Sequence, residues 1–194
     1  MMFSLDQINA ASAEEAARLL EPLIENSPEL VSVAQRQRPF ATVSDLEAAL
    51  VGTILSLPPE QQAALFRRHP CLAGREARDG TMTDASTSEQ GRLGLDRLAA
   101  DDLARLDGLN ASYAQRFGHP CIVALVNVPD LDNLFETFER RLQAEPPAEH
   151  AENLTQIAEV IRARIAKAIG TPDGPVSLSP KPAQVTEKTM ENDT

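Results

Sequence analysis

The sequence predicts an all-α fold, a compact single-domain bundle of about eight helices with a disordered C-terminal tail. Apolar residues recur at helical spacing along almost the whole chain, and glycine is scarce, at 9 of 194 residues. Helix-capping pairs also precede several of the apolar runs. We place the helical domain at residues 1–170 and the tail at residues 171–194, because the tail contains four prolines and no apolar period.

Four helices are expected in the first part of the chain. Residues Ser12–Glu15 have the spacing of a capping box and precede an apolar face, and Ser44–Glu47 repeat that spacing before a second apolar stretch. Pro58-Pro59 can open a further helix, because proline is tolerated in a first turn. The four helices are therefore expected over about residues 13–23, 28–37, 45–57 and 60–68.

The middle of the chain is expected to contain a loop and two more helices. Residues 69–85 show no sustained period and read as the loop. Ser86–Glu89 again have capping-box spacing and would begin a helix that continues to about Leu98, and Asp101 or Asp102 would cap the next helix. The apolar stripe of that next helix is Leu103, Leu106, Leu109, Tyr113 and Phe117, and Gly118 follows as its natural stop.

The last part of the domain combines one ambiguous segment with two helices. Residues 119–129 are apolar and rich in β-branched side chains, so they form either a buried extended segment or a short helix. One helix would begin at Asp130 or Asp132 and end near Glu145, and a long one would cover about residues 148–169. The inward face of the long helix is expected to be Leu154, Ile157, Ile161, Ile165 and Ala168, with Gly170 as the stop.

Composition and charge exclude several classes of function. The net charge of −11 argues against a nucleic-acid partner and against docking on anionic lipid, and any anionic substrate would need local cations. The longest apolar run has six residues, from Cys121 to Val126, too few for a membrane helix. Two cysteines and no secretory signal predict a soluble protein of the reducing cytoplasm.

Histidine provides the first candidate for chemistry, since the glycine-rich phosphate loops, the serine-hydrolase elbow and His-Glu-x-x-His are all missing. Two of the three histidines stand in matching tripeptides, His69-Pro70-Cys71 and His119-Pro120-Cys121. His69 follows a helix, so it either caps the helix C-terminus or serves in catalysis. We expect His119 to be a packed, hydrogen-bonded side chain. The spacing disfavours a zinc site shared by the tripeptides, and no metal is expected.

A polar cluster from Ser86 to Gln90 provides the second candidate. Its residues could simply cap a helix, or the helix N-terminus together with Glu89 and Gln90 could bind an oxygen-rich or heterocyclic ligand. Arg162 and Arg164 on the last helix point about 200° apart. Only one of them can therefore face such a ligand and supply the cation that an anion requires.

Together these segments resemble the 2-oxo-4-hydroxy-4-carboxy-5-ureidoimidazoline decarboxylases of urate breakdown, the OHCU decarboxylase family. The resemblance covers residues 1 to about 170, with the segments in the family's order. They are Arg38-Pro39-Phe40, His69 to Gly74, Ser86 to Gln90 with Gly94-Leu95-Asp96, Leu109-Asn110 with Tyr113, Phe117 to Val123, Arg140 or Arg141 with Leu142, and Arg164-Ile165. This chain departs from the family at His119 and Cys121, where aromatic residues are common.

The resemblance implies an all-α carboxy-lyase that uses no cofactor and converts OHCU to (S)-allantoin and CO₂. His69 corresponds to the family's catalytic histidine, which we expect to act as general acid/base with help from Glu89. Arg164 corresponds to the family arginine of the last helix, with Arg162 as the alternative register. The family's substrate-binding positions fall on Pro70, Ser86, Thr87, Ser88, Glu89, Gln90, Cys121, Ile122, Val123, Ala124 and Leu125, to which we add Arg164.

The expected partner is a small-molecule substrate, with neither nucleic acid nor membrane involved. An apolar helix face could also support a homodimer. The competing interpretation is a non-catalytic helical interaction module of the same fold. The two differ in one feature, because only an enzyme needs His69, Ser86, Glu89 and Gln90 together in one pocket.

Overall fold

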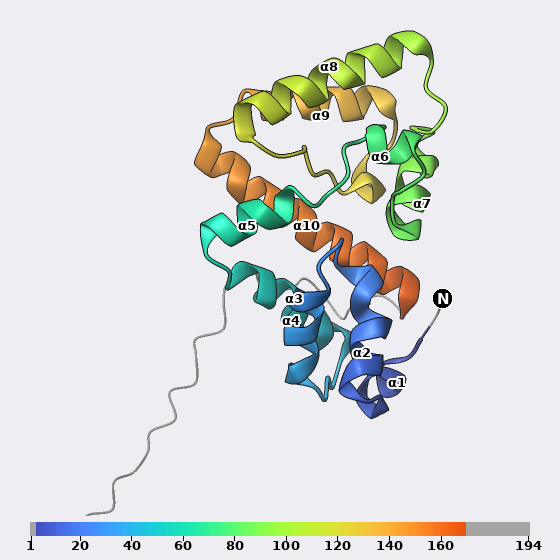
Figure 1. Ribbon diagram of the computed structural model, residues 1–194, viewed down its shortest axis with the longest axis vertical. Coiled ribbons are helices and arrows are strands. Elements are labelled where there is room, and N and C mark those ends of the chain that lie inside the picture. Colours follow the sequence, from blue (N-terminus) through green and yellow to red (C-terminus); the bar gives the residue numbers. More distant parts are fainter. Residues whose placement is uncertain (1–2, 170–194) are drawn as a thin grey trace, which may run out of the picture.

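The computed structural model describes residues 3–169, which contain ten α-helices, three 3₁₀ turns and no β-strand. The predicted all-α class is therefore confirmed for this part of the chain (Figure 1). The expected tail, residues 171–194, lies outside the described residues. The helices are α1 (Leu5–Ala10), α2 (Ala13–Leu20), α3 (Pro28–Ala34), α4 (Val43–Leu55), α5 (Pro59–Phe66), α6 (Arg75–Arg78), α7 (Asp84–Arg92), α8 (Ala100–Phe117), α9 (Leu131–Leu142) and α10 (Pro146–Ala168), and the 3₁₀ turns are η1 (Glu21–Leu23), η2 (Gln35–Gln37) and η3 (Leu125–Asn127).

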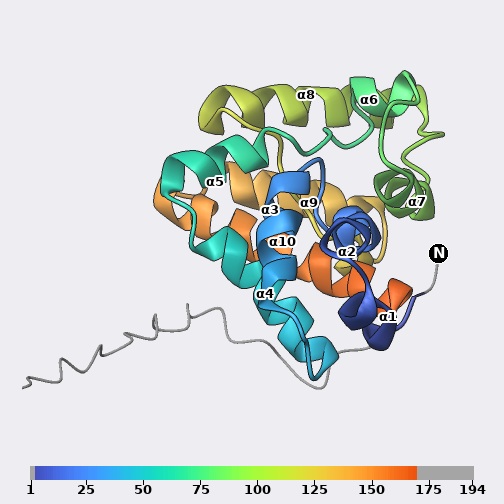
Figure 2. The same ribbon diagram turned by 60° about the horizontal axis from the view of Figure 1, so that its bottom comes forward.

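Helix α10 is the central element, and two hydrophobic clusters form around it. Figures 1 and 2 show it running past α1 to α4 at one end and towards α8 and α9 at the other. The first cluster joins α1 to α5 with the inward face of α10, where Ile157, Ile161 and Ile165 are buried as predicted. The second cluster is built on α8 and α9, and it contains most of the predicted α8 stripe, including buried Leu106 and Tyr113.

Helix starts in the first half follow local capping chemistry, with one correction. Ser12 forms the predicted capping box with Glu15. The box before α4, however, is made by Thr42 and Asp45 rather than by Ser44 and Glu47. Glu47 cannot serve there, because its carboxylate is fully buried. Helix α1, whose own box is Ser4 with Gln7, was not predicted.

Helix α7 also begins earlier than its sequence suggests. The Oγ1 of Thr83 accepts a hydrogen bond from the Ser86 N–H at 3.3 Å, so Thr83 is the N-cap and Ser86 lies inside the first turn. The predicted cap at Ser86 is wrong, and its side chain is therefore free to point at the protein interior. The helix ends at Arg92 rather than near Leu98, and Gly94 follows in the left-handed conformation, with φ of 69°.

The remaining boundaries are close to expectation. The prediction that Asp101 or Asp102 caps α8 is wrong. The N-cap is Ala99, which has no side chain able to cap, and both aspartates lie in the first turn, where the helix dipole favours carboxylates. Gly118 ends α8 at φ 77°, as predicted. Asp130 caps α9 through a 2.9 Å bond from the Asn133 N–H.

The segment that periodicity left undecided is extended, with a single 3₁₀ turn at η3. The expected loop at residues 69–85 contains the short helix α6.

Arg38, from a motif shared with the decarboxylase family, donates to the carbonyls of Ile8 and Ala11 at 2.7 Å each and so joins α1 to the loop before α4. None of the helices described here has the length and apolar character needed to span a bilayer.

Candidate active site

An open pocket lies where the two hydrophobic clusters meet α10, and its empty space is about 380 Å³ when the solvent at its mouth is included. Its walls come from the loop after α5, from α7, from the extended segment that leads into η3 and from α10. It brings together most of the residues that the sequence singled out. The lining residues are His69, Pro70, Leu72, Ser86, Glu89, Gln90, Cys121, Ile122, Val123, Leu125, Val160 and Arg164.

His69 follows the last turn of α5, where its ring both contacts a carbonyl of that helix and lines the pocket. Its Nδ1 lies 3.3 Å from the carbonyl oxygen of Leu65, one of the last carbonyls of that helix. A carbonyl only accepts hydrogen bonds, so Nδ1 carries the hydrogen in the neutral ring and Nε2 is left as the base. Nε2 has no hydrogen-bond partner among residues 3–169, and the ring lines the pocket.

Burial controls the protonation state of His69. Desolvation lowers its pKa from 6.5 to about 4, and the negative charge of Glu25 opposes this shift only in part. The hydrogen bond to the Leu65 carbonyl also opposes the shift, whereas electrostatic interactions with Arg164 and His119 contribute to it. The imidazole is therefore neutral at pH 7, and once protonated it would be a strong acid.

Helix α7 presents one face to the pocket. Ser86, Glu89 and Gln90 lie three and four residues apart, which places them on the same side of a helix, and all three line the cavity. Thr87 and Ser88 are exposed on the other side, where Ser88 accepts a bond from Lys167 at 3.0 Å. Of the five residues from Ser86 to Gln90, the pocket thus receives three.

Arg164 is the arginine of α10 that faces the pocket. It binds Glu89 through two parallel contacts, Nε to Oε1 at 2.8 Å and Nη2 to Oε2 at 2.9 Å. Its Nη2 also lies 2.8 Å from Oε2 of Glu25. Desolvation lowers the pKa of Arg164, but the two carboxylates outweigh this and raise it, so the guanidinium stays charged. Arg162 points elsewhere and pairs with Glu47 at 2.9 Å.

The extended segment from Cys121 to Leu125 forms the opposite wall. Its side chains alternate as in a strand, with Ile122 in the first cluster and Cys121, Val123 and Leu125 in the second. Its backbone is fixed to α10, because the N–H of Ile122 bonds Asn153 at 3.4 Å and that of Ala124 bonds Gln156 at 2.8 Å. Ala124 itself does not line the pocket.

A buried polar network supports this wall from behind. Arg141, wholly inaccessible to solvent, donates to the carbonyl of Ile122 and pairs with Glu149. The Tyr113 hydroxyl also donates to Glu149, and Arg141 reaches Oδ1 of Asn153 at 2.8 Å. Tyr113 and Arg141 belong to the motifs that resemble the decarboxylase family, and the structure gives them a supporting position rather than a place in the pocket.

Gln90 lines the pocket, but its amide is engaged with the loop after His69. Its Oε1 accepts from the Ala73 N–H at 2.8 Å, and its Nε2 donates to the Cys71 carbonyl at 3.4 Å. Asn110 holds the same loop from α8 by donating to the Leu72 carbonyl at 2.9 Å. The loop that carries His69 into the pocket is thus fastened on two sides.

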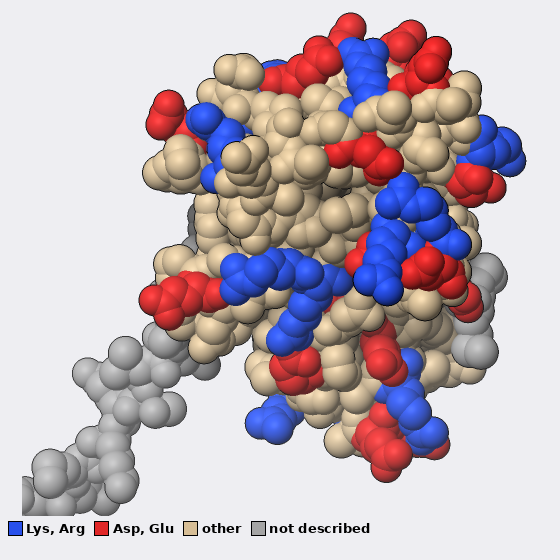
Figure 3. All heavy atoms as spheres, turned by 45° about the horizontal axis from the view of Figure 1, so that its top comes forward, with Lys and Arg blue, Asp and Glu red and all other residues tan. Residues whose placement is uncertain are grey.

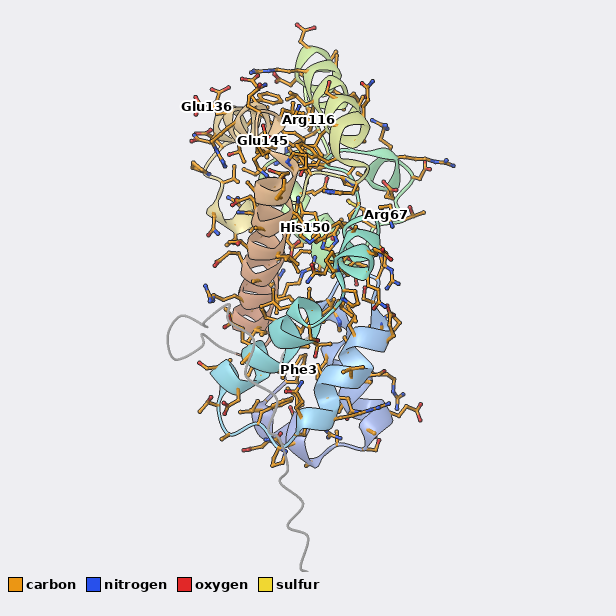
Figure 4. All side chains as sticks on the ribbon, turned by 90° about the vertical axis from the view of Figure 1, so that its left-hand side faces the viewer. Phe3, Arg67, Arg116, Glu136, Glu145 and His150 are labelled. Carbon is orange, nitrogen blue, oxygen red and sulfur yellow. The ribbon has the colours of Figure 1, made fainter. Side chains whose placement is uncertain are left out.

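The other two histidines lie outside the pocket lining. His119 is buried against the ring of Phe66, with centroids 5.1 Å apart, and its Nδ1 lies 2.9 Å from the Pro120 carbonyl, so the prediction of a packed, hydrogen-bonded residue is confirmed. Figure 4 shows His150 on α10, on the side near α5, where its Nε2 lies 2.7 Å from Gln62.

Of the two positions that depart from the family, only Cys121 reaches the pocket, and burial raises the pKa of its thiol to about 12. Among residues 3–169 no group of three or more His, Cys, Asp or Glu side chains is placed to hold a metal ion.

Three residues at the pocket were missed by sequence reasoning. Leu72 and Val160 contribute apolar wall, and nothing distinguishes them from other core residues. Glu25 lies behind Ser86 and Arg164 and is almost fully buried. It is one of 29 acidic residues, and its local sequence shows no sign that it would be buried.

Comparisons with known proteins find relatives over most of the chain. The sequence profile of the family described as OHCU decarboxylase matches residues 9–166. A protein of Mus musculus named 2-oxo-4-hydroxy-4-carboxy-5-ureidoimidazoline decarboxylase is 33% identical over 164 residues, which are 84% of this chain and 92% of that protein. A protein of the same name from Xenopus laevis is 32% identical over 161 residues, 83% of this chain and 91% of that one.

Two solved structures share the fold. A crystal structure described as OHCU decarboxylase in the presence of (S)-allantoin has a TM-score of 0.62 at 16% identity, covering 81% of this chain and 97% of the other. A crystal structure of (S)-allantoin synthase has a TM-score of 0.66 at 20% identity and covers 86% of this chain. This chain spans only 54% of that second protein, about half its length.

Proposed function

The chain belongs to the OHCU decarboxylase family, and we propose that the pocket at His69 is where it converts 2-oxo-4-hydroxy-4-carboxy-5-ureidoimidazoline to (S)-allantoin and CO₂. The family is one of decarboxylating lyases of urate degradation. One observation carries the assignment of the site. His69, Glu89 and Arg164, from three separate parts of the chain, line a single pocket. A helical module that only bound other proteins would have no need of that convergence.

The proposed reaction requires protons to be moved between groups, but it needs no cofactor to accept electrons, because the substrate ring can accept them. When the bond to the carboxylate breaks, its electron pair can move into the adjacent C=N bond of the imidazoline ring, so the reaction as we propose it uses no cofactor. The ring nitrogen that receives the electron pair takes up one proton from solvent, which is the net proton uptake of the reaction. The hydroxyl proton is released as the carbonyl forms, and the ring carbon that bears the ureido group gains one proton in exchange. A fixed group must deliver that proton to one face if a single enantiomer is to form.

His69 fits this role through its free Nε2. The neutral imidazole can accept a proton from the substrate hydroxyl as the carbonyl of the product forms, and the resulting imidazolium can then give a proton to the ring carbon. The low pKa of His69 makes the imidazolium a strong donor toward carbon. We propose that Glu89 assists, because its carboxylate lines the same pocket beside Ser86.

Arg164 is the local cation for an anionic substrate. Its Nε and Nη2 are committed to Glu89 and Glu25, whereas Nη1 makes only a 3.4 Å contact with the Pro22 carbonyl among the described residues. That nitrogen is the one left to meet a substrate oxygen. Figure 3 shows one face of the molecule where basic and acidic side chains lie side by side, so local cations are present despite the net charge of −11.

The wall opposite α7 offers backbone groups to the rest of the substrate. Since Ile122 and Ala124 direct their N–H groups at α10, the intervening N–H of Val123 points the other way, as in any extended chain. It has no partner among residues 3–169. We assign it to an oxygen of the ring or of the ureido group, with Pro70 and Cys121 completing the wall.

The experiment that tests this function is circular dichroism in the allantoin absorption band. Urate oxidase and hydroxyisourate hydrolase would generate the substrate in place, and the protein would then be added. We expect rapid formation of one allantoin enantiomer, lost in His69→Asn and retained in His150→Asn, whose imidazole lies outside the pocket. Slow, racemic product in all samples would reject the decarboxylase function and leave the interaction module.

The proposal also covers the domain bounds, the compartment and the oligomeric state of the protein. We place the activity in residues 1–170 and the protein in the cytoplasm, where the unpaired thiols of Cys71 and Cys121 would stay reduced. The substrate is a small molecule. The homodimer remains a prediction, which sedimentation or light scattering would check.

A further inference from the structure

Glu25 is a buried carboxylate that faces the pocket residues from behind. Its residue is 3% exposed, and both of its oxygens are occupied. Oε1 accepts from the Thr83 hydroxyl at 2.8 Å, and Oε2 accepts from the Ser86 hydroxyl at 2.9 Å. Oε2 also lies 2.8 Å from Nη2 of Arg164. One side chain from the loop after η1 thus holds one residue of α10 and two from the start of α7.

This contact determines what Ser86 can offer a ligand. A hydroxyl has one hydrogen to donate and two lone pairs to accept with. The hydrogen of Ser86 goes to Glu25, and Nη2 of Arg164 approaches one lone pair at 3.3 Å. Toward the pocket Ser86 therefore presents only an acceptor.

Arg164 depends on the same carboxylate for its position. Glu89 holds one edge of the guanidinium, and Glu25 holds Nη2 from the other side. Burial on its own would raise the pKa of Glu25, but the charge of Arg164 and the three hydrogen bonds outweigh it, so the pKa is lowered. Glu25 is therefore ionised at neutral pH and can act as a strong acceptor.

We propose that Glu25 is a positioning residue that fixes Ser86 as a hydrogen-bond acceptor and Arg164 in its orientation, so that the pocket selects a substrate group with an N–H at Ser86. The inference rests on the proposed function. In that reaction the N–H would be one of the ring or of the ureido group. An oxygen-only ligand would meet no donor at Ser86.

Variants at Glu25 separate the acceptor from its charge. Glu25→Met removes the acceptor, and we expect kcat/KM to fall about 10- to 100-fold because Ser86 can rotate and Arg164 can shift. Glu25→Gln keeps one oxygen for Ser86 and Arg164 and an amide for Thr83, so it should retain activity within a few-fold. Glu25→Asp keeps the charge, but its side chain is one methylene shorter, so the carboxylate no longer reaches Ser86 and Arg164. This variant should therefore lose activity as Glu25→Met does.

The matched control is Glu47, a fully buried carboxylate paired with Arg162 on the same helix but outside the pocket. Glu47→Met should lower the thermal midpoint as Glu25→Met does while sparing kcat/KM. Coupling to Ser86 supplies a second readout. In a Ser86→Ala background, Glu25→Met should lower kcat/KM by a clearly smaller factor than in the wild type, because the Ser86 hydroxyl that Glu25 positions is already absent.

The outcomes are distinct. Wild type that forms no excess allantoin overturns the proposed function, and this inference with it. Active wild type with equal losses in Glu25→Met and Glu47→Met, or with fully additive effects of Glu25→Met and Ser86→Ala, overturns the positioning role alone. If Glu25→Met does not fold, the comparison of Glu25→Gln with Glu25→Asp decides. Activity kept in Glu25→Asp and lost in Glu25→Gln would mean that the charge matters rather than the placed acceptor, and would overturn the positioning role.

Discussion

Glu89 and Arg164 form a two-point contact across the pocket, with their paired atoms 2.8 and 2.9 Å apart. They lie 75 residues apart in the chain, on α7 and α10. The planar guanidinium matches the carboxylate in both position and orientation. The contact therefore joins α7 to α10 at the pocket and holds the two opposite charges together.

Arg164→Lys tests the value of that geometry. Lysine keeps the charge but cannot make two parallel bonds, so we expect kcat/KM to fall about 10- to 100-fold through loss of orientation. The control is Arg162→Lys, two residues earlier, which contacts Glu47 and Glu159 outside the pocket. Steady-state kinetics of both variants would show the contrast, and equal activities would contradict a role for the two-point contact.

The low pKa of His69 predicts how activity depends on acidity. The mechanism that we propose needs a neutral imidazole in the free enzyme, so kcat/KM should stay level from pH 7 downwards and fall only near the folded-state pKa of about 4. Proton NMR of the His69 ring would measure that pKa directly, since the chain has only three histidines. A midpoint near 6.5 would mean that the ring is not desolvated in solution.

The same pKa predicts a loss of stability in acid. Between about pH 6.5 and 4 the unfolded chain binds a proton at His69 that the folded protein excludes, so the free energy of unfolding falls as the pH is lowered through this window. Urea unfolding at several pH values would show it. His69→Gln should be less sensitive over the same window, and identical slopes for the two proteins would refute the prediction.

Arg141 should be the most sensitive charged residue outside the pocket. Arg141→Met leaves the buried carboxylate of Glu149 without its cation, and removing one partner of such a pair typically costs about 3–5 kcal/mol. The exposed pair Arg75 and Asp79 serves as control, and Arg75→Ala should change the free energy of unfolding by less than about 1 kcal/mol. Chemical denaturation would compare the two, and similar effects would mean that the buried network adds little.

Gly74 is required by the turn that follows His69. A Cβ there would lie 2.5 Å from the Cβ of Cys71, so Gly74→Ala must shift the turn, and we expect a cost of about 1–3 kcal/mol and reduced activity. At Gly91 on α7, a Cβ would meet no neighbouring atom within 4 Å, so Gly91→Ala should instead stabilise by about 0.5–1 kcal/mol. Thermal unfolding of the two variants should therefore move in opposite directions.

Local features were predictable wherever their cause lies within a few residues of sequence. The apolar stripe of α8, the stop at Gly118, the cap at Asp130 and the inward face of α10 depend on helical periodicity and on hydrogen bonds over three or four positions. The ordered motifs likewise indicated His69 and the cluster from Ser86 to Gln90. Helix starts were less certain, because Ser44 and Ser86 share the capping pattern with Thr42 and Thr83, which serve as the caps.

By itself, then, the sequence determined the all-α class, most of the helices and the residues that carry the family resemblance. Only the tertiary structure decided that Arg164 rather than Arg162 faces the pocket, that Ser86 points inward and that Glu25 stands behind both. These facts depend on contacts between segments far apart in the chain, 61 residues for Glu25 and Ser86. Periodicity identifies the buried face of a helix, but which partner meets that face is set by how the helices pack together.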